Sequence, residues 1–283
     1  MFGKSKTKQK KVADSLIFLL LAIGAIVMIA PLLWMLSTSV KQKSDVFALP
    51  PVWIPTDINW SKYLEIWEAG PLLTGIQNSI IVSLTVCIIG TFTSSLAAFA
   101  FGKLRLKHKN KLFLLLLSAM MIPYPSLMIP QFSMFAQIGW VDTLLPLIIP
   151  PIFGNIIMIF FLRQYLINVP NSIIEAAKID GSSFFGMFTR LIFPLIKPAI
   201  AAQFILWFMG VWNDYLAPII YLNSPDKLTL QLVIASFNAT YAIQTDYPLI
   251  MAASIVSLLP MLIVFLIFQR QIIESIAISG SKG

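Results

Sequence analysis

Long uncharged stretches constrain the fold of this chain more than any other feature. Of its 283 residues, 58% are hydrophobic and only 11% are charged, whereas a soluble domain carries roughly a quarter charged residues. A helix needs roughly 20 apolar residues to cross the hydrocarbon of a bilayer. The stretches between charges that approach or exceed this length are residues 15–40, 69–102, 112–141, 143–162, 198–213 (continuing past Asp214 to 220) and 247–269. The sequence therefore predicts an all-α integral membrane protein.

We predict six transmembrane helices, which lie near residues 15–37, 77–101, 112–131, 143–162, 198–221 and 249–268. A signal peptide is the alternative for the first helix. Its apolar run is longer than the 7–15 residues of a signal-peptide core, and no small-residue cleavage site follows it. We therefore interpret it as a retained span. The expected organisation is a basic tail at 1–14, the first helix at 15–37, an external segment rich in Pro and Trp at 38–76, a membrane core at 77–270 that includes a cytosolic loop at 164–197, and a tail at 271–283.

The placement of the basic residues predicts the orientation. With the N-terminus inside, sixteen of the twenty Lys and Arg residues lie on the cytoplasmic side, and eight of the twelve acidic residues lie outside. Cytoplasmic loops carry an excess of Lys and Arg. We therefore expect both termini in the cytoplasm of a bacterial cell, which agrees with an even number of spans. Because these basic residues flank spans, they indicate lipid headgroups rather than nucleic acid as their partners.

Several spans contain proline, which removes a backbone donor and bends a helix. The third span contains Pro123, Pro125 and Pro130. Bent helices suit a transport pathway, although static membrane proteins also contain them. The single cysteine, Cys87, lies in an apolar span and is expected to be a packing residue. His108 lies in a basic turn, where a solvated role is favoured over metal binding, and we expect no metal site.

The loop at 164–197 has the pattern of two short helices. Ser172 followed by Glu175 fits a capping box, which predicts a helix from 173 to 179. Gly181 can end that helix, because glycine adopts the left-handed conformation without steric cost. A second helix capped by Ser182 or Ser183 would carry one apolar face made of Phe184, Phe185, Phe188 and Leu191. The residues alone leave two readings equally open, namely insertion into a cleft of a soluble partner and a simple connection.

The same stretch resembles the EAA loop of binding-protein-dependent ABC importer permeases. The matching positions are Glu175, Ala176, Ala177, Gly181, Leu191, Phe193 and Pro194. Leu191 and Phe193 are conservative departures from the family pattern, and Asp180 before the glycine is usual in the sugar-importing branch. The resemblance covers about 200 residues. It includes Asn78-Ser79, the turn at 139–143, Trp212-Asn213-Asp214 and the ending at 279–283, which are similar to the smaller permease subunit of maltose-type importers.

This resemblance implies a type I ABC importer transmembrane domain and a set of partners. They are a second, non-identical permease subunit, a dimer of cytoplasmic ABC ATPases, an extracytoplasmic solute-binding protein, membrane lipids and a carbohydrate substrate. The residues implied to couple to the ATPase are Glu175, Ala176, Ala177, Asp180, Gly181, Leu191 and Pro194. The external segment at 223–246 resembles a loop that reaches toward the binding protein.

The chain contains no pattern for catalysis of its own. ATP binding of the P-loop type needs a Gly-x-x-x-x-Gly-Lys-Ser/Thr run between a strand and a helix, and Gly3-Lys4-Ser5 lacks the upstream glycine. We therefore expect no catalytic residue and no cofactor in this chain, with ATP and Mg²⁺ bound by a partner ATPase.

Polar groups inside membrane spans are functional candidates by default. We expect the translocation path among Asn78, Asn155, Trp207, Trp212, Asn213, Asp214 and Tyr215. Amides and carboxylates beside aromatic rings suit sugar hydroxyls, but Asn also bonds helix to helix. In maltose-type importers the other permease subunit supplies most sugar contacts.

The sequence leaves three alternatives to carbohydrate import. The first is an ABC permease for a non-sugar solute. The second is an ion-coupled secondary transporter, which would need buried ionic relays, although Asp214 is the only acid in the spans. The third is a non-transporting assembly factor, for which the loop would be a connector.

Overall fold

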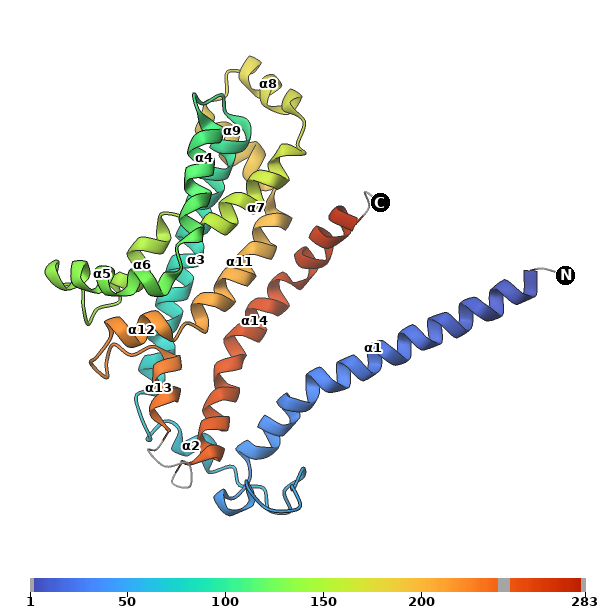
Figure 1. The fold of residues 1–283 in the computed structure, drawn as a ribbon, viewed down its shortest axis with the longest axis vertical. Helices are drawn as coiled ribbons and strands as arrows, with labels where there is room; N and C mark the ends of the chain where they lie inside the picture. The colour runs from blue at the N-terminus through green and yellow to red at the C-terminus, as the bar shows by residue number, and fades with distance from the viewer. Residues whose placement is uncertain (1–2, 239–244, 281–283) are drawn as a thin grey trace. The chain divides into compact units, whose positions relative to one another are not determined.

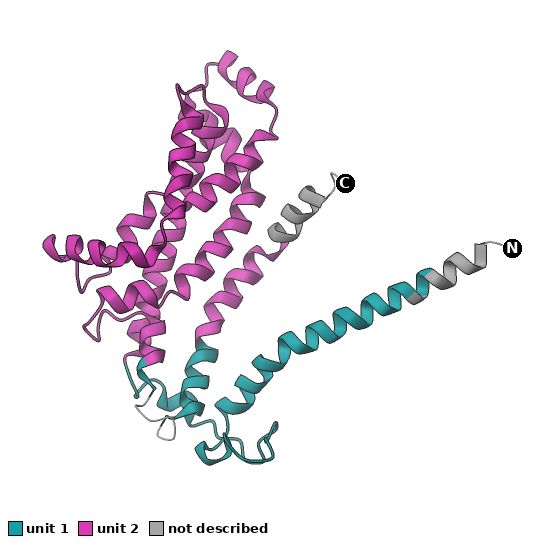
Figure 2. Ribbon diagram, in the orientation of Figure 1, with its two compact units in different colours: residues 1–70, 236–256 teal, residues 71–235, 257–283 magenta. Residues whose placement is uncertain are grey.

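The structure is a computed structural model that describes residues 3–238 and 245–280. Within these ranges the chain is helical and contains no strand (Figure 1). The chain divides into two compact units, one formed by residues 1–70 and 236–256 and the other by residues 71–235 and 257–283 (Figure 2). The two units are described separately.

The first unit contains α1 (Gly3–Ser39), whose apolar part is Ala13–Ser39. Its most hydrophobic window has no buried residue, which suits a helix whose surroundings are lipid or another subunit. The expected first helix at 15–37 lies within it. The short helices η1 (Lys43–Asp45) and α2 (Lys62–Glu65) follow in the segment at 38–76. Helix α2 is a single turn.

Aromatic and ionic contacts hold the first unit together. The rings of Trp34 and Trp53 meet edge-on with centroids 5.0 Å apart, and the Lys41 ammonium lies 3.8 Å from the Trp34 centroid. The Lys62 ammonium lies 2.9 Å from the Asp246 carboxylate. Asp246 also accepts a hydrogen bond from the backbone amide of Leu249, at the start of α14 (Tyr247–Gly280). These contacts tie the segment at 38–76 to the start of α14.

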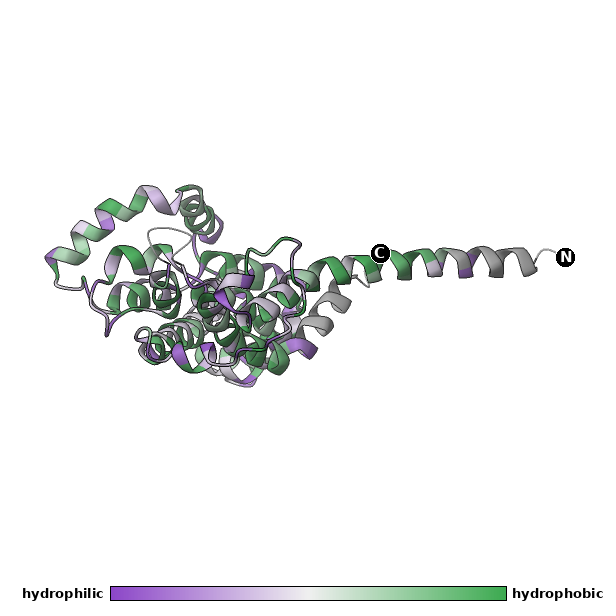
Figure 3. Ribbon diagram, turned by 90° about the horizontal axis from the view of Figure 1, so that it is seen from below, coloured by the Kyte–Doolittle hydropathy of each residue, from purple (hydrophilic) through white to green (hydrophobic). Residues whose placement is uncertain are grey.

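The second unit is organised around one long helix, α3 (Leu72–Lys103). The remaining helices of this unit are α4 (Lys109–Ser118), η2 (Ala119–Met121), α5 (Tyr124–Gln137), α6 (Leu145–Ile152), α7 (Ile156–Ile167), α8 (Asn171–Ile179), α9 (Phe184–Met187), the π-helix η3 (Phe188–Ile192), α10 (Phe193–Leu195), α11 (Lys197–Trp212), α12 (Leu216–Tyr221), most of α13 (Leu230–Ser236) and residues 257–280 of α14. Hydrophobic residues recur along these helices (Figure 3). Helix α3 contacts α6, α7 and α11, so it is the central element.

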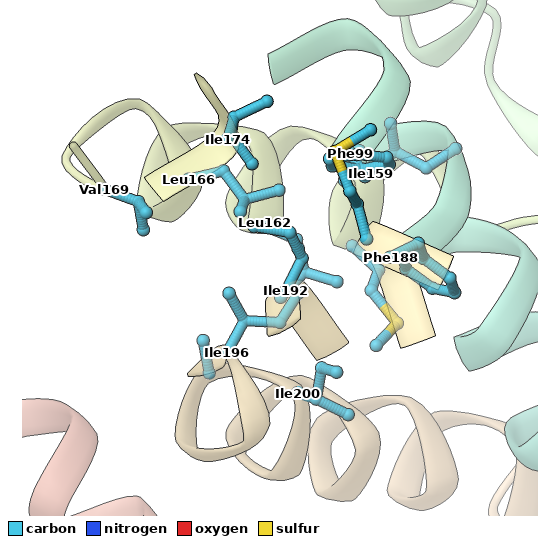
Figure 4. Packing of buried hydrophobic residues seen from close by; sticks show 14 of the residues in the cluster. Phe99, Ile159, Leu162, Leu166, Val169, Ile174, Phe188, Ile192, Ile196 and Ile200 are labelled. Carbon is cyan, nitrogen blue, oxygen red and sulfur yellow. The ribbon is translucent and has the colours of Figure 1, made fainter. Parts of the chain in front are cut away.

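Small residues allow these neighbours to approach α3 closely. A Cβ atom built on Gly90 would lie 2.3 Å from Trp207 Cη2 and 3.0 Å from the Pro151 carbonyl oxygen. No real Cβ tolerates the first distance, so the indole of Trp207 occupies the space that a side chain at position 90 would need. A buried cluster joins α3 to α7 and α11 through Phe99, Leu162 and Ile200 (Figure 4).

Two of the predicted single helices are broken, which corrects the sequence-based expectation. The third span, expected at 112–131, consists of α4–η2 and α5, which meet at 93°. The break lies at Ile122–Pro123, where Pro123 lacks an amide donor and precedes a second proline. The fifth span, expected at 198–221, consists of α11, which ends at Trp212, and α12, which begins at Leu216. There the Asp214 carboxylate accepts the amides of Leu216 and Ala217 and starts a new helix.

The fourth span also carries a local break. Gly154 has a φ of +135°, and the Asn155 side chain caps α7 by accepting the Met158 amide at 3.0 Å. The described residues contain four helical stretches long and apolar enough to cross a membrane, or up to six if each bent pair is one span. The bent pairs are α4–η2 with α5, and α9–α10 with α11. The count of six therefore stays a prediction.

Candidate functional site

The loop at 164–197 is anchored to the end of α3. The Lys103 ammonium donates to the Val169 carbonyl at 2.6 Å and to the Asn171 side-chain oxygen at 2.9 Å. Arg163 donates to the Phe101 carbonyl at 3.3 Å, and its guanidinium lies 4.1 Å from the Phe113 ring centroid. The first residue of α8 is thus held by the last residue of α3.

Helix α8 has one buried side and one exposed side. Ile174 and Ala177 belong to the buried cluster of the second unit, whereas Glu175, Ala176 and Ile179 are exposed, Ile179 by 87%. Helix α8 therefore packs on the core through one helical turn, and its opposite side is exposed. Ala177, expected among the coupling residues, lies on the side that packs inward.

The start of α8 differs from the expectation and its end agrees with it. The helix begins at Asn171 after Pro170, and no side chain caps it, so the capping box from Ser172 to Glu175 is wrong. Gly181 has a φ of +75°, and the Ser182 amide donates to the Ala177 carbonyl at 2.9 Å. This is the glycine-ended C-terminus that the sequence predicted. No atom lies within 4 Å of where a Cβ of residue 181 would stand, so there is space for a side chain. Glycine is therefore required by the backbone conformation and not by crowding.

The second helix of the loop is not a single α-helix. Ser183 caps α9 by accepting the Gly186 amide at 3.1 Å, as expected. A π-helix follows from Phe188, and the wider turn changes the spacing of the side chains. Phe188 is buried while Phe184 and Phe185 are each 59% exposed, so the expected common apolar face is wrong. Of the other expected coupling residues, Asp180, Leu191 and Pro194 are exposed.

The seven expected path residues do not form one cluster. Asn78 donates to the carbonyls of Asp226 and Leu228 at 3.1 and 2.9 Å and holds a loop. Trp212 is buried and donates to the Ser257 carbonyl at 3.0 Å. Asn213 bonds to the Met209 carbonyl at 2.9 Å.

The remaining four expected path residues have separate roles as well. Asn155 caps α7, and Trp207 packs against Gly90. Tyr215 is exposed by 43%. Of the seven, Asp214 alone lines the cavity described below.

The cavity next to Asp214 has a volume of about 340 Å³ and is lined by residues of α3, α5, α6, α11, α12 and the segment before α13. Polar groups on its wall include Ser79, Gln131, Tyr221 and Thr229, which the sequence analysis did not select. Gln131 could have been found from the sequence, because it is an amide inside an apolar span, as Asn155 is. The hydroxyl residues could not, because hydroxyl side chains are common in membrane helices. They are Ser79, Tyr221 and Thr229.

The described residues contain no group of three or more His, Cys, Asp or Glu side chains that could hold a metal ion. Residues 239–244 and 281–283 lie outside the described part of the chain, so the expected binding-protein loop is described only at 223–238 and 245–246 and the expected C-terminal ending only at 279–280.

Known proteins are similar to this chain in sequence and in fold. The chain is 30% identical over 281 residues to the arabinooligosaccharides transport system permease protein AraQ of Halalkalibacterium halodurans, which covers 98% of this chain and 100% of the relative. It is 30% identical over 282 residues to the melibiose/raffinose/stachyose import permease protein MelC of Bacillus subtilis, at 99% of each chain. It is 29% identical over 270 residues to the lactose transport system permease protein LacG of Rhizobium radiobacter, at 95% and 96%.

A solved structure matches with a TM-score of 0.80 at 22% identity, over 93% of this chain and 97% of the other. It is a bacterial ABC transporter involved in the import of the acidic polysaccharide alginate. At this identity the match shows a shared fold. The family model described as "binding-protein-dependent transport system inner membrane component" matches residues 1–277. The chain therefore belongs to this family of multi-pass inner-membrane transport components.

Proposed function

We propose that this chain is one of two non-identical permease subunits of an ATP-driven carbohydrate importer. Family membership, together with relatives whose names specify arabinooligosaccharides, lactose and melibiose/raffinose/stachyose, supports this proposal. In the proposed arrangement a solute-binding protein delivers the sugar on the outer side. A dimer of ATPase subunits, which binds ATP and Mg²⁺, drives the permease from the inner side.

The observation that carries the coupling role is the two-sided helix α8. Its inner side packs on the core through Ile174 and Ala177, and its outer side presents Glu175 and the exposed Ile179. An amphipathic helix with one free apolar group suits a groove in a partner. Movement of that groove would be transmitted as a rigid-body shift, because α8 is tied to the core rather than hanging from flexible chain.

The proposed topology has six spans, each bent pair crossing the membrane once, and both termini in the cytoplasm. The excess of Lys and Arg on that side supports it. The same topology makes 1–14 and 271–283 cytoplasmic tails, 15–37 the first span and 38–76 external. It makes 77–270 the transport core, with 164–197 exposed to the cytoplasm. Labelling of single cysteines placed at 107 and 57 by an impermeant reagent from each side tests this orientation.

Two exposed isoleucines provide a matched test of the coupling surface. Ile179 is 87% exposed in the loop, and Ile54 is 84% exposed in the external segment. Ile179→Asp is expected to abolish co-purification of the ATPase subunits with the membrane-inserted permease, whereas Ile54→Asp is expected to retain it. ATP-dependent uptake of labelled oligosaccharides into proteoliposomes should follow the same pattern. Retained ATPase binding by Ile179→Asp, or equal loss in both variants, would contradict the proposal.

A further inference from the structure

The cavity beside Asp214 lies within the second unit and is formed by this chain alone. Its volume of about 340 Å³ falls in the range of roughly 300–1,000 Å³ that small-molecule sites occupy. Such sites combine an apolar lining with a few polar groups that fix the orientation of a ligand. This cavity has both features, on different parts of its wall.

One polar group on the wall lacks a partner. Thr229 is 5% exposed, lines the cavity, and its hydroxyl makes no hydrogen bond. An unsatisfied buried hydroxyl costs about 1–3 kcal/mol, so native structures rarely keep one unless another molecule satisfies it. The Thr229 oxygen is buried in the wall, and rotation of its side chain would bring it to the cavity, where a ligand with hydrogen-bonding groups would satisfy it.

Two further groups have hydrogen-bonding capacity left over. Asp214 uses Oδ1 for the amides of Leu216 and Ala217 at 3.0 and 3.3 Å, which leaves Oδ2 as an acceptor for a ligand. Gln131 accepts the Tyr221 hydroxyl through Oε1 at 3.2 Å, which leaves its amide nitrogen as a donor. An acceptor, a donor and a hydroxyl on one wall match a ligand that carries several hydroxyl groups.

The rest of the wall is apolar and aromatic. The rings of Phe135 and Tyr221 meet edge-on with centroids 5.3 Å apart, and Leu147 and four prolines add aliphatic surface. A pyranose or furanose ring has this same division, with hydroxyl groups at its edge and C–H groups on its faces. Glycerol-like polyols lack the flat apolar face.

The charge of the wall restricts the kind of sugar. Among the described residues, Asp214 is the only charged one that lines the cavity, and no Lys or Arg does. A carboxylate on the ligand would meet a like charge in a partly buried site without a compensating cation, which is unfavourable. We propose that this cavity binds one ring of a neutral carbohydrate, with Asp214 and Gln131 pairing with its hydroxyl groups, and that it rejects uronic acids. The proposal rests on the proposed function and adds a substrate class and a site in this subunit.

Protection of a cysteine from modification tests the site directly. Thr229→Cys in a Cys87→Ala background places the chain's only thiol in the wall of the cavity. If this variant does not assemble, Val82→Cys on the apolar wall is the second reporter. The complete importer in nanodiscs is treated with N-ethylmaleimide in the presence of one glycoside at a time. The neutral glycosides are methyl β-glucoside, methyl β-galactoside and methyl α-arabinofuranoside, and the charged one is methyl β-glucuronide. Glycerol at equal concentration is the control. Mass spectrometry of this chain measures the rate of modification.

The expected result is that at least one neutral glycoside slows modification severalfold relative to glycerol, while the glucuronide does not. Gln131→Leu should remove this protection. Gln137→Leu on the same helix, whose side chain is exposed and does not line the cavity, should retain it. Equal protection by the glucuronide, protection that persists in Gln131→Leu, or no protection by any neutral glycoside would overturn the proposal. A thiol that never reacts at either position would also overturn it, because a cavity that does not admit a maleimide does not admit a sugar ring.

Failure of this site and failure of the proposed function are separable. Uptake of labelled oligosaccharides by the same preparation reports the function without reference to the cavity. An importer that transports oligosaccharides without cavity protection refutes the site alone. Protection in a complex that transports no carbohydrate refutes the proposed function alone.

Discussion

Lys103 and Asn171 join the central helix to the loop that faces the proposed ATPase. The Lys103 ammonium lies 2.9 Å from the Asn171 side-chain oxygen and 2.6 Å from the Val169 carbonyl oxygen. One side chain at the end of α3 therefore fixes both the last turn before α8 and the first residue of α8. A shift of α8 must move α3 or break these two bonds.

Replacing Lys103 is expected to weaken the coupling of ATP hydrolysis to transport. Lys103→Met removes two charge-assisted hydrogen bonds, each worth about 1.5–3 kcal/mol when buried and less at this half-exposed position. We expect uptake per ATP hydrolysed to fall severalfold while the ATPase subunits still co-purify. Lys103→Arg keeps the charge and donors and should restore most of the coupling. An unchanged transport-to-hydrolysis ratio in Lys103→Met would contradict this role.

The backbone conformation of Gly181 predicts which residues can replace it. At a φ of +75°, a β-branched residue is strained by about 1–2 kcal/mol or more, whereas Asn tolerates this region. Gly181→Val should therefore abolish uptake without preventing membrane insertion, and Gly181→Asn should remain active. Both are measured as uptake per inserted complex. Since no atom lies within 4 Å of the site of a Cβ, equal defects in the two variants would rule out backbone strain as the cause.

The carboxylate of Asp142 joins two turns, its own and the one at Asn223 and Ser224. It accepts the amides of Asn223 and Ser224 at 2.9 and 2.8 Å and also bonds the Ser224 hydroxyl. Hydrogen bonds from Ser224 and then Asn223 lower the pKa of Asp142 below its ordinary 3.8. The carboxylate of Asp142 therefore stabilises the two turns fully when the pH is above its ordinary pKa. This stabilisation is lost as the pH falls through the lowered pKa of the folded state.

Hydrogen exchange at Asn223 and Ser224 measures this effect. We expect both amides to exchange faster once the pH falls below 3.8, after correction for the intrinsic exchange rate. Asp142→Ala should show faster exchange at neutral pH and no further acid step. Asp142→Asn keeps an acceptor and tolerates the φ of +61°, so it should be intermediate. Acid-insensitive protection in the unmodified protein would show that the carboxylate does not hold the turn.

The contact between Gly90 and Trp207 predicts a compensating pair. Gly90→Ala forces a methyl group against the indole, which should destabilise the protein by about 1–3 kcal/mol, the usual cost of overpacking. Trp207→Phe removes the ring atoms that the methyl group meets. We expect the double variant to be more stable than Gly90→Ala alone in thermal unfolding of the purified protein. Additive losses would place the strain at the Pro151 carbonyl instead.

The sequence by itself predicted the features whose cause lies within a few residues of each other. Apolar length and flanking charge determine membrane spans, because no local partner can satisfy a charge in hydrocarbon. The turn at Asp180-Gly181 and the cap at Ser183 follow from residue chemistry that acts over one helical turn. These predictions required no knowledge of distant contacts, and the resemblance around Glu175 identified the family.

Only the tertiary structure decided where the spans break and which polar groups meet. Asp214 starts a new helix within the stretch at 198–221 that was predicted as one span, and Thr229 is buried in the wall of the same cavity only because α3, α6 and α12 pack together. The π-helix at Phe188 changed the direction of side chains that an ideal helix would have aligned. Such outcomes depend on packing between segments far apart in the chain, whose energies periodicity and propensity do not contain.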